Sequence, residues 1–172
     1  MNRTLSLVAM VVAAGSFAVG VGAQGMAHVD VKDATGQSVG TAMLSATKEG
    51  GVSIAINFKG LPPGEHALHF HQTAKCEAPF TSAGGHFNPG MKKHGMENPE
   101  GPHAGDMANF TVAADGTAKA TILNAKVTLG AGDNSVYANG GTALMIHAKA
   151  DDMKTDPSGS AGDRIACGLV VK

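Results

Sequence analysis

The chain has 172 residues, a formal net charge of -1 from 13 basic and 14 acidic residues, and 43% hydrophobic against 16% charged residues. This length predicts one domain, and the apolar share excludes an intrinsically disordered chain. The absence of excess positive charge argues against a nucleic-acid partner. The 24 glycines exceed their usual share and favour an all-β fold with many tight turns.

Residues 1–23 have the composition of a secretory signal peptide. Arg3 is the only charge in this stretch, an apolar run follows it, and Val21-Gly22-Ala23 matches the small-residue cleavage rule. We therefore expect cleavage before Gln24 and export to the periplasm or the extracellular space. The mature domain would span 24–172, without stable membrane association. A retained membrane anchor is the alternative, but glycines dilute the apolar run and no basic cluster follows it.

Alternating apolar and polar residues predict eight short strands after the leader. The segment 52–58 shows the pattern most clearly, because its large apolar residues occupy every second position. No stretch of ten residues has helical periodicity. The pattern predicts an eight-stranded antiparallel Greek-key sandwich or flattened barrel. The expected strands are 28–31, 38–47, 52–58, 66–72, 109–113, 117–123, 143–149 and 165–171.

Two long segments, 73–107 and 150–164, interrupt this rhythm. Loops of this length are uncommon in compact domains unless they carry function. We expect a metal site and a disulfide to order them. In an oxidising compartment Cys76 and Cys167 can pair, two unrelated free thiols being the alternative.

Seven of the eight histidines lie between residues 66 and 147. His69 and His71 are two positions apart in a predicted strand, so their side chains share one face. Imidazole suits copper and zinc, and six histidines with an aspartate exceed what one tetrahedral ion can use. Two ions are therefore expected. His28 lies outside every motif and is expected to be an exposed histidine. The candidate ligands are His69, His71, His86, His94, His103, Asp106 and His147.

Several motifs resemble those of copper/zinc superoxide dismutases. They occur in order over essentially the whole mature chain, and together they are highly specific. The long stretch between Cys76 and His86 is more similar to the bacterial exported branch of the family. The motifs are GEHALHFH at 64–71, GGHFNP at 84–89, KHG at 93–95, HAGD at 103–106, MIHAKADD at 145–152 and GDRIACG at 162–168.

The resemblance implies a role for each residue. Copper would be held by His69, His71, His86 and His147. Zinc would be held by His86, His94, His103 and Asp106, with the His86 ring bridging both ions. The remaining roles would be an outer carboxylate for Asp151, structural packing under the site for His66, anion guidance and catalysis for Arg164, and a disulfide between Cys76 and Cys167.

The resemblance also implies an enzyme that converts superoxide to dioxygen and hydrogen peroxide by copper redox cycling. One copper ion and one structural zinc ion would be bound per subunit, and the enzyme would protect the extracytoplasmic space. A homodimer is compatible with this interpretation. The alternative is a non-enzymatic exported copper- and zinc-binding protein on the same fold. A missing copper ligand or a missing arginine would favour that alternative, but the sequence contains them all.

Overall fold

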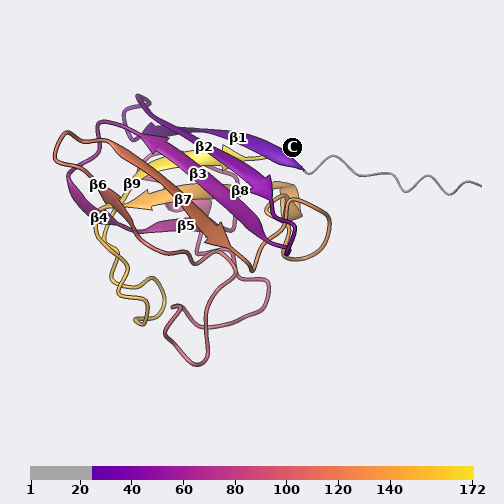
Figure 1. Ribbon diagram of the computed structural model, residues 1–172. Helices are drawn as coiled ribbons and strands as arrows, with labels where there is room; N and C mark the ends of the chain where they lie inside the picture. Colours follow the sequence, from indigo (N-terminus) through magenta and orange to yellow (C-terminus); the bar gives the residue numbers. More distant parts are fainter. Residues whose placement is uncertain (1–24) are drawn as a thin grey trace, which may run out of the picture.

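The computed structural model describes residues 25–172, so the predicted leader lies outside the described residues. This part of the chain contains strands, loops and two short 3-10 helices (Figure 1). It has no helix that is long and apolar enough to cross a membrane. The strands are β1 (Met26–Asp33), β2 (Ser38–Ala46), β3 (Val52–Phe58), β4 (Gly64–His66), β5 (Leu68–His71), β6 (Phe110–Val112), β7 (Ala118–Asn124), β8 (Thr142–His147) and β9 (Arg164–Val170).

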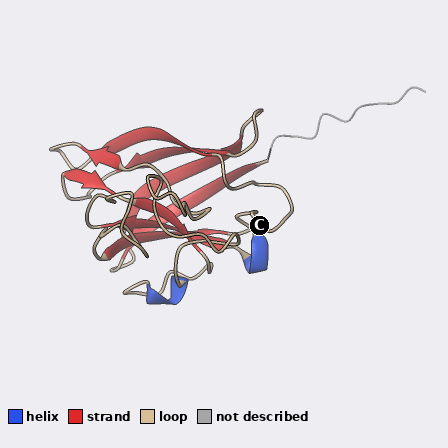
Figure 2. Ribbon diagram, turned by 90° about the horizontal axis from the view of Figure 1, so that it is seen from below, coloured by secondary structure: helices blue, strands red, loops and turns tan. Residues whose placement is uncertain are grey.

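Seven strands form one antiparallel sheet in the order β5-β8-β9-β1-β2-β3-β7, and β4 pairs with β6 in a second, two-stranded sheet. The large sheet curls into a half-barrel (Figure 2). β7 pairs with β3, and β8 pairs with β5, although neither pair is consecutive in the sequence. Such crossovers are typical of a Greek key. The predicted all-β antiparallel fold is confirmed.

The core is built from the inward positions of alternating strands. In β3, Val52, Ile54, Ile56 and Phe58 are buried, while the residues between them are more exposed. This is the period-2 burial that a strand imposes when one of its faces is covered. The core therefore fills the inside of the curled sheet.

The predicted strand at 66–72 is split into two strands, so residues 25–172 contain nine strands rather than the expected eight. β4 ends at His66 and β5 begins at Leu68. The backbone N–H of Ala67 donates to the carbonyl of Lys149, and the carbonyl of Ala67 accepts from the N–H of His147. These bonds divert the chain between the two sheets. The alternation of apolar and polar residues does not reveal this break, because the small side chain of Ala67 fits both a continuous strand and a junction between two strands.

The two long loops lie on the same side of the sheet and contact each other (Figure 1). The N–H of Glu97 donates to the carbonyl of Met153 at 3.0 Å, and the N–H of His94 donates to Asp156 Oδ1 at 2.7 Å. Gly95 has a φ of +108°, and a Cβ there would meet the Met153 oxygen at 2.2 Å. Only glycine allows the two backbones to come this close.

Candidate metal centre

Four buried imidazoles form a first cluster, in which one ring nitrogen of each lies within 4.8 Å of the others. His69 and His71 project from β5, and His147 ends the paired strand β8. His86 comes from the following loop and forms a β-bridge with His71. The Nε2 atoms of His71 and His147 are 3.3 Å apart. Paired strands therefore hold three of the four rings, as the sequence pattern predicted for His69 and His71.

A second cluster consists of His86, His94, His103 and Asp106, all buried and also mutually within 4.8 Å. Asp106 Oδ1 lies 2.8 Å from Nδ1 of His86, 3.1 Å from Nδ1 of His94 and 3.3 Å from Nδ1 of His103. Its other oxygen accepts the backbone N–H groups of Gly95 and His103. All four residues come from the loop between β5 and β6. Within the described residues, His86 is the one side chain common to both four-residue clusters.

Asp151 bridges the two clusters from outside. Its carboxylate lies 2.8 Å from Nε2 of His69 and 2.9 Å from Nε2 of His94. The side chain of Asn109 fixes the backbone of Asp151 in both directions, donating to its carbonyl and accepting its N–H, each at 2.9 Å. An outer carboxylate of this kind orients a metal-binding imidazole and sets which nitrogen is free.

The donor atoms of the clusters fit bound metal ions. In the described part of the chain, four buried side-chain nitrogen or oxygen atoms have no hydrogen-bond partner. Three of them are His69 Nδ1, His86 Nε2 and His94 Nδ1. A buried polar atom without a partner is costly, so three in one place indicate atoms that serve another ligand. Imidazole nitrogens with one carboxylate are a donor set for copper and zinc.

The electrostatics of the first cluster and of Asp106 leave these donors ready for cations. Burial lowers the pKa of His71 to about 2, of His147 to about 3 and of His86 to about 4, so the rings are neutral near pH 7. Burial would raise the pKa of Asp106, but the close imidazole rings of His103, His86 and His94 outweigh it and keep this pKa well below its usual range. Neutral imidazole and charged carboxylate are the protonation states that metal ligation requires.

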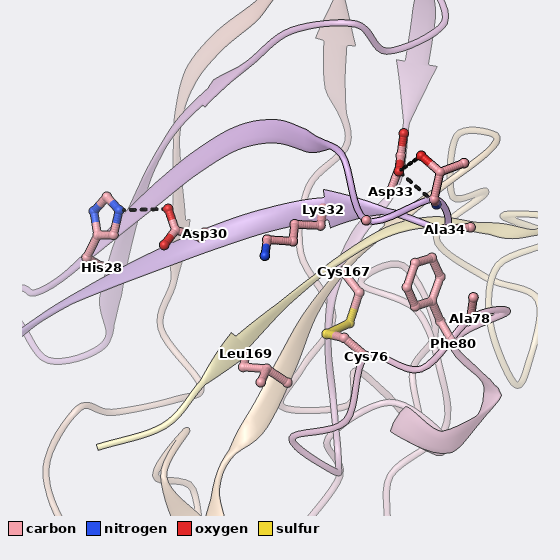
Figure 3. A pocket seen from close by; sticks show the side chains of 12 residues that line it. His28, Asp30, Lys32, Asp33, Ala34, Cys76, Ala78, Phe80, Cys167 and Leu169 are labelled. Atoms are coloured by element: carbon pink, nitrogen blue, oxygen red, sulfur yellow. Dashed lines mark hydrogen bonds and ion pairs between the residues drawn. A yellow bond between two sulfur atoms is a disulfide. The ribbon is translucent and has the colours of Figure 1, made fainter.

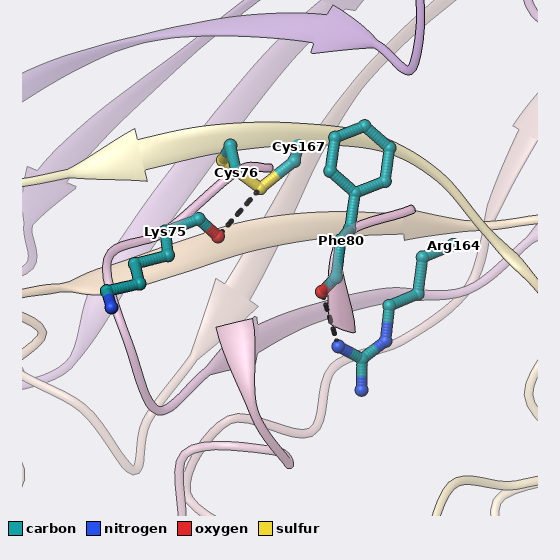
Figure 4. The surroundings of a disulfide bond; sticks show 5 residues. All are labelled: Lys75, Cys76, Phe80, Arg164 and Cys167. Carbon is teal, nitrogen blue, oxygen red and sulfur yellow. Dashed lines mark hydrogen bonds between the residues drawn. A yellow bond between two sulfur atoms is a disulfide. The ribbon is translucent and has the colours of Figure 1, made fainter. Parts of the chain in front are cut away.

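Arg164 lies beside the first cluster, at the start of β9. One guanidinium nitrogen donates to the carbonyl of Phe80 at 2.6 Å, as Figure 4 shows, and another donates to the carbonyl of Gly84 at 2.7 Å. The disulfide between Cys76 and Cys167 attaches this loop to β9 and confirms the predicted pairing. A cavity of about 530 Å³ is lined by Arg164 together with His71, His86 and His147. The fixed cation therefore faces a space that an anion can enter.

His66 is buried outside both clusters. Its Nδ1 lies 2.7 Å from the carbonyl oxygen of His147, and its Nε2 lies 2.8 Å from the carbonyl oxygen of Pro62. The ring also packs against Phe110. Both nitrogens are used by backbone carbonyls, which agrees with the predicted structural position beneath the site.

The sequence reasoning missed three residues that shape the site. Asn109 holds Asp151, and Asp156 holds the backbone of His94. Gly159 packs so closely against the bridge that a Cβ would lie 1.8 Å from Asp151 Oδ1. An Asn three residues after Asp106 and a Gly in a polar loop are common features, so no local signal distinguishes them from turn residues.

Comparisons with known proteins agree with this geometry. The family model described as "Copper/zinc superoxide dismutase (SODC)" matches residues 38–170. A relative from Aquifex aeolicus, copper–zinc superoxide dismutase 2, is 50% identical over 147 residues, which are 84% of this chain and 85% of that protein. The crystal structure of a SOD-like protein from Bacillus subtilis is 36% identical, with a TM-score of 0.81, and the match covers 84% of this chain and 97% of that one. The Cu/Zn superoxide dismutase from Brucella abortus is 28% identical, with a TM-score of 0.70 and coverage of 85% and 99%.

Proposed function

The chain belongs to the copper/zinc superoxide dismutase family, and on this premise we propose which residues of this superoxide dismutase hold its two metal ions. Copper is held by His69, His71, His86 and His147, and zinc by His86, His94, His103 and Asp106. One ion of each kind is bound per chain. The observation that carries this assignment is the His86 ring. Its Nδ1 lies beside Asp106, while its buried Nε2 has no hydrogen-bond partner.

Copper, when bound, supplies one-electron oxidation and reduction, and zinc supplies fixed positive charge without redox chemistry. The substrate, superoxide, is a small anion. Arg164 attracts it, because the guanidinium is held by two carbonyls at the wall of the cavity and presents a fixed positive charge.

His86 also takes part in proton handling in this proposal. The second superoxide leaves as hydrogen peroxide and needs two protons. His86 Nε2 is a buried imidazole nitrogen at this cavity with no hydrogen-bond partner, and it could hold one of these protons when it is not bound to copper. Asp106 fixes the opposite edge of the ring, so the protonating atom stays in place.

The domain and its compartment are part of the same proposal. The leader 1–23 directs export, and the mature domain 24–172 acts in the periplasm or outside the cell. The Cys76–Cys167 disulfide supports this location, because such bonds persist in oxidising compartments. Cell fractionation and the mass of the mature chain test it, a start at Gln24 being the expected result.

The ligand assignment is tested by metal analysis of two variants. His147→Ala removes a ligand of the first cluster alone, and His103→Ala removes a ligand of the second cluster alone. We expect the first variant to lose copper and keep zinc, and the second to lose zinc first. His28→Ala is the matched control for zinc content and for activity, because His28 is an exposed histidine in β1 and belongs to neither cluster.

Superoxide consumption is measured on the same proteins. The His147→Ala variant should lose activity, whereas the His28→Ala variant should keep it. Full copper content and activity in His147→Ala would overturn the assignment. A wild-type protein that holds copper but does not accelerate dismutation would instead favour a metal-binding protein without catalysis.

A further inference from the structure

The outer face of the large sheet carries a group of soft metal ligands on β1 and β2. These two strands contribute no residue to the two buried clusters. Met26 and His28 are alternate residues of β1 and point to the solvent side, and Met43 of β2 points to the same side. Met26 is 70% exposed, Met43 is 37% exposed and the His28 side chain is 53% exposed. Their neighbours Val29 and Leu44 point into the core.

The register of the strands places these three residues together. His28 is the direct partner of Met43 in the antiparallel pair β1–β2. Directly opposite residues have Cβ atoms about 5 Å apart, and diagonal ones about 7–8 Å apart. Met26 is paired with Ser45 and so is diagonal to Met43. Methionine is long and flexible, so two thioethers can converge on the ring of His28.

The His28 ring has the outer partner that metal-binding histidines commonly have. Its Nε2 lies 3.2 Å from Asp30 Oδ1, the next outward residue of β1 (Figure 3). This contact favours the proton on Nε2 and leaves Nδ1 free to ligate. Both side chains are largely exposed, so the pair itself adds little to stability.

We propose that Met26, His28 and Met43 form a surface site for a soft monovalent cation, with Cu(I) as the physiological ion and Ag(I) as its redox-inert analogue. Two thioethers and one imidazole suit such a cation and offer no oxygen ligand for Mg²⁺ or Ca²⁺. The site lies on the sheet, away from the loop residues that form the second cluster. It does not depend on which buried histidines hold the catalytic ions.

The chain provides its own controls. Met91 and Met96 are 91% and 53% exposed, in the loop between β5 and β6. The nearest histidine in the sequence, His94, is fully buried. These methionines therefore have comparable access to solvent but lack an exposed imidazole from the same segment.

The test is a titration of the full chain with Ag⁺, followed through ¹³C-labelled methionine methyl groups. The buried clusters are first filled with Zn²⁺, which is diamagnetic and occupies the competing histidines. At one equivalent of Ag⁺ we expect the methyl signals of Met26 and Met43 to shift, while those of Met91 and Met96 stay in place. Equal shifts of all four signals would overturn the proposal, since they would show binding by exposed thioethers alone.

Variants make the same test quantitative. Met43→Leu should abolish the shift of Met26 at one equivalent, whereas Met96→Leu should leave it unchanged. Asp30→Asn should weaken Ag⁺ binding roughly tenfold, the smaller of the effects usual for loss of an outer carboxylate. If His28→Ala binds Ag⁺ as tightly as the parent protein, with the same methyl shifts, the assignment is wrong.

Discussion

His71 and Arg164 share one hydrogen-bond acceptor, the carbonyl oxygen of Gly84. This oxygen lies 2.9 Å from Nδ1 of His71 and 2.7 Å from a guanidinium nitrogen of Arg164. A candidate copper ligand and the guanidinium that lines the adjoining cavity are thus held by the same peptide group. One loop therefore fixes the position of both side chains.

Replacement of Arg164 by Ala should slow superoxide turnover without releasing metal. The variant loses the fixed charge in the cavity, and we expect a decrease of roughly tenfold at low salt with a weaker dependence on ionic strength. Arg164→Lys should recover only part of the rate, because an ammonium group cannot reach both carbonyls as the planar guanidinium does. Pulse radiolysis at several salt concentrations measures this. Unchanged kinetics in Arg164→Ala would remove the residue from the mechanism.

Reduction of the Cys76–Cys167 disulfide should destabilise the protein. The two residues are 91 positions apart, and release of a loop of this length lowers the free energy of unfolding by up to roughly 4–5 kcal/mol. Phe80 follows Cys76 closely, so the hydrogen bond to Arg164 should also loosen. Urea unfolding of the oxidised protein and of a Cys76→Ser, Cys167→Ser variant measures the difference. Identical midpoints would contradict the expected constraint.

Asp156→Ala should weaken metal binding at the second cluster. Its carboxylate accepts the backbone N–H of His94, so its loss frees the segment that carries this ligand. We expect roughly tenfold weaker Co²⁺ binding, with Co²⁺ as a spectroscopic probe of the zinc position. Asp156→Asn keeps an acceptor oxygen and should bind almost normally. Asp115→Ala is the matched control, because Asp115 caps a distant turn at Thr117. Equal affinity in Asp156→Ala and this control would refute the coupling.

Gly159→Ala should disturb the bridge between the clusters. The new Cβ would lie 1.8 Å from Asp151 Oδ1 and 2.7 Å from Nε2 of His94, so the carboxylate must move. We expect loss of zinc affinity and a changed spectrum of bound Cu²⁺. Gly36→Ala tests whether the effect is local. Gly36 also has a positive φ, but nothing lies within 4 Å of its added Cβ. If both variants lose zinc affinity to the same extent, backbone strain and not displacement of Asp151 is responsible.

The metal-free protein should lose stability as the pH falls below about 6.5. Burial lowers the folded-state pKa of His71, His147 and His86 to about 2, 3 and 4, whereas the unfolded chain binds these protons near pH 6.5. Protons therefore favour the unfolded chain over this window, and the free energy of unfolding decreases.

The titration of His94 changes the stability of the metal-free protein in the opposite direction. Burial alone would lower its pKa, but the carboxylates of Asp106 and Asp151 raise it to about 9. Its stabilising contribution to the free energy of unfolding is present at pH 6.5 and is lost as the pH rises towards 9. Stability of the metal-free protein should therefore be highest near neutral pH and should fall more steeply on the acid side. Denaturant titrations from pH 4 to pH 9 measure this profile, and a flat profile below pH 6.5 would contradict it.

The sequence is informative for residues whose place follows from the periodicity of the strand that carries them. Alternation identified β3, and His69 with His71 could be placed on one face from strand geometry alone. The spacing of His86, His94 and His103 predicted an ordered loop but could not place their rings, because tertiary contacts decide the path of an irregular segment. Asp156 and Asn109 act by holding another residue's backbone, and a single sequence carries no sign of such a role.

In the proposed assignment two ions share the His86 ring, and this sharing would limit how the centre can diverge. His71 belongs to one four-residue cluster and His103 to the other, so a mutation at either can cost a single ion. His86 belongs to both clusters. A descendant of this protein could lose the binding of copper alone or of zinc alone through mutation of an unshared histidine. A substitution at position 86 would weaken the binding of both ions in a single mutational step.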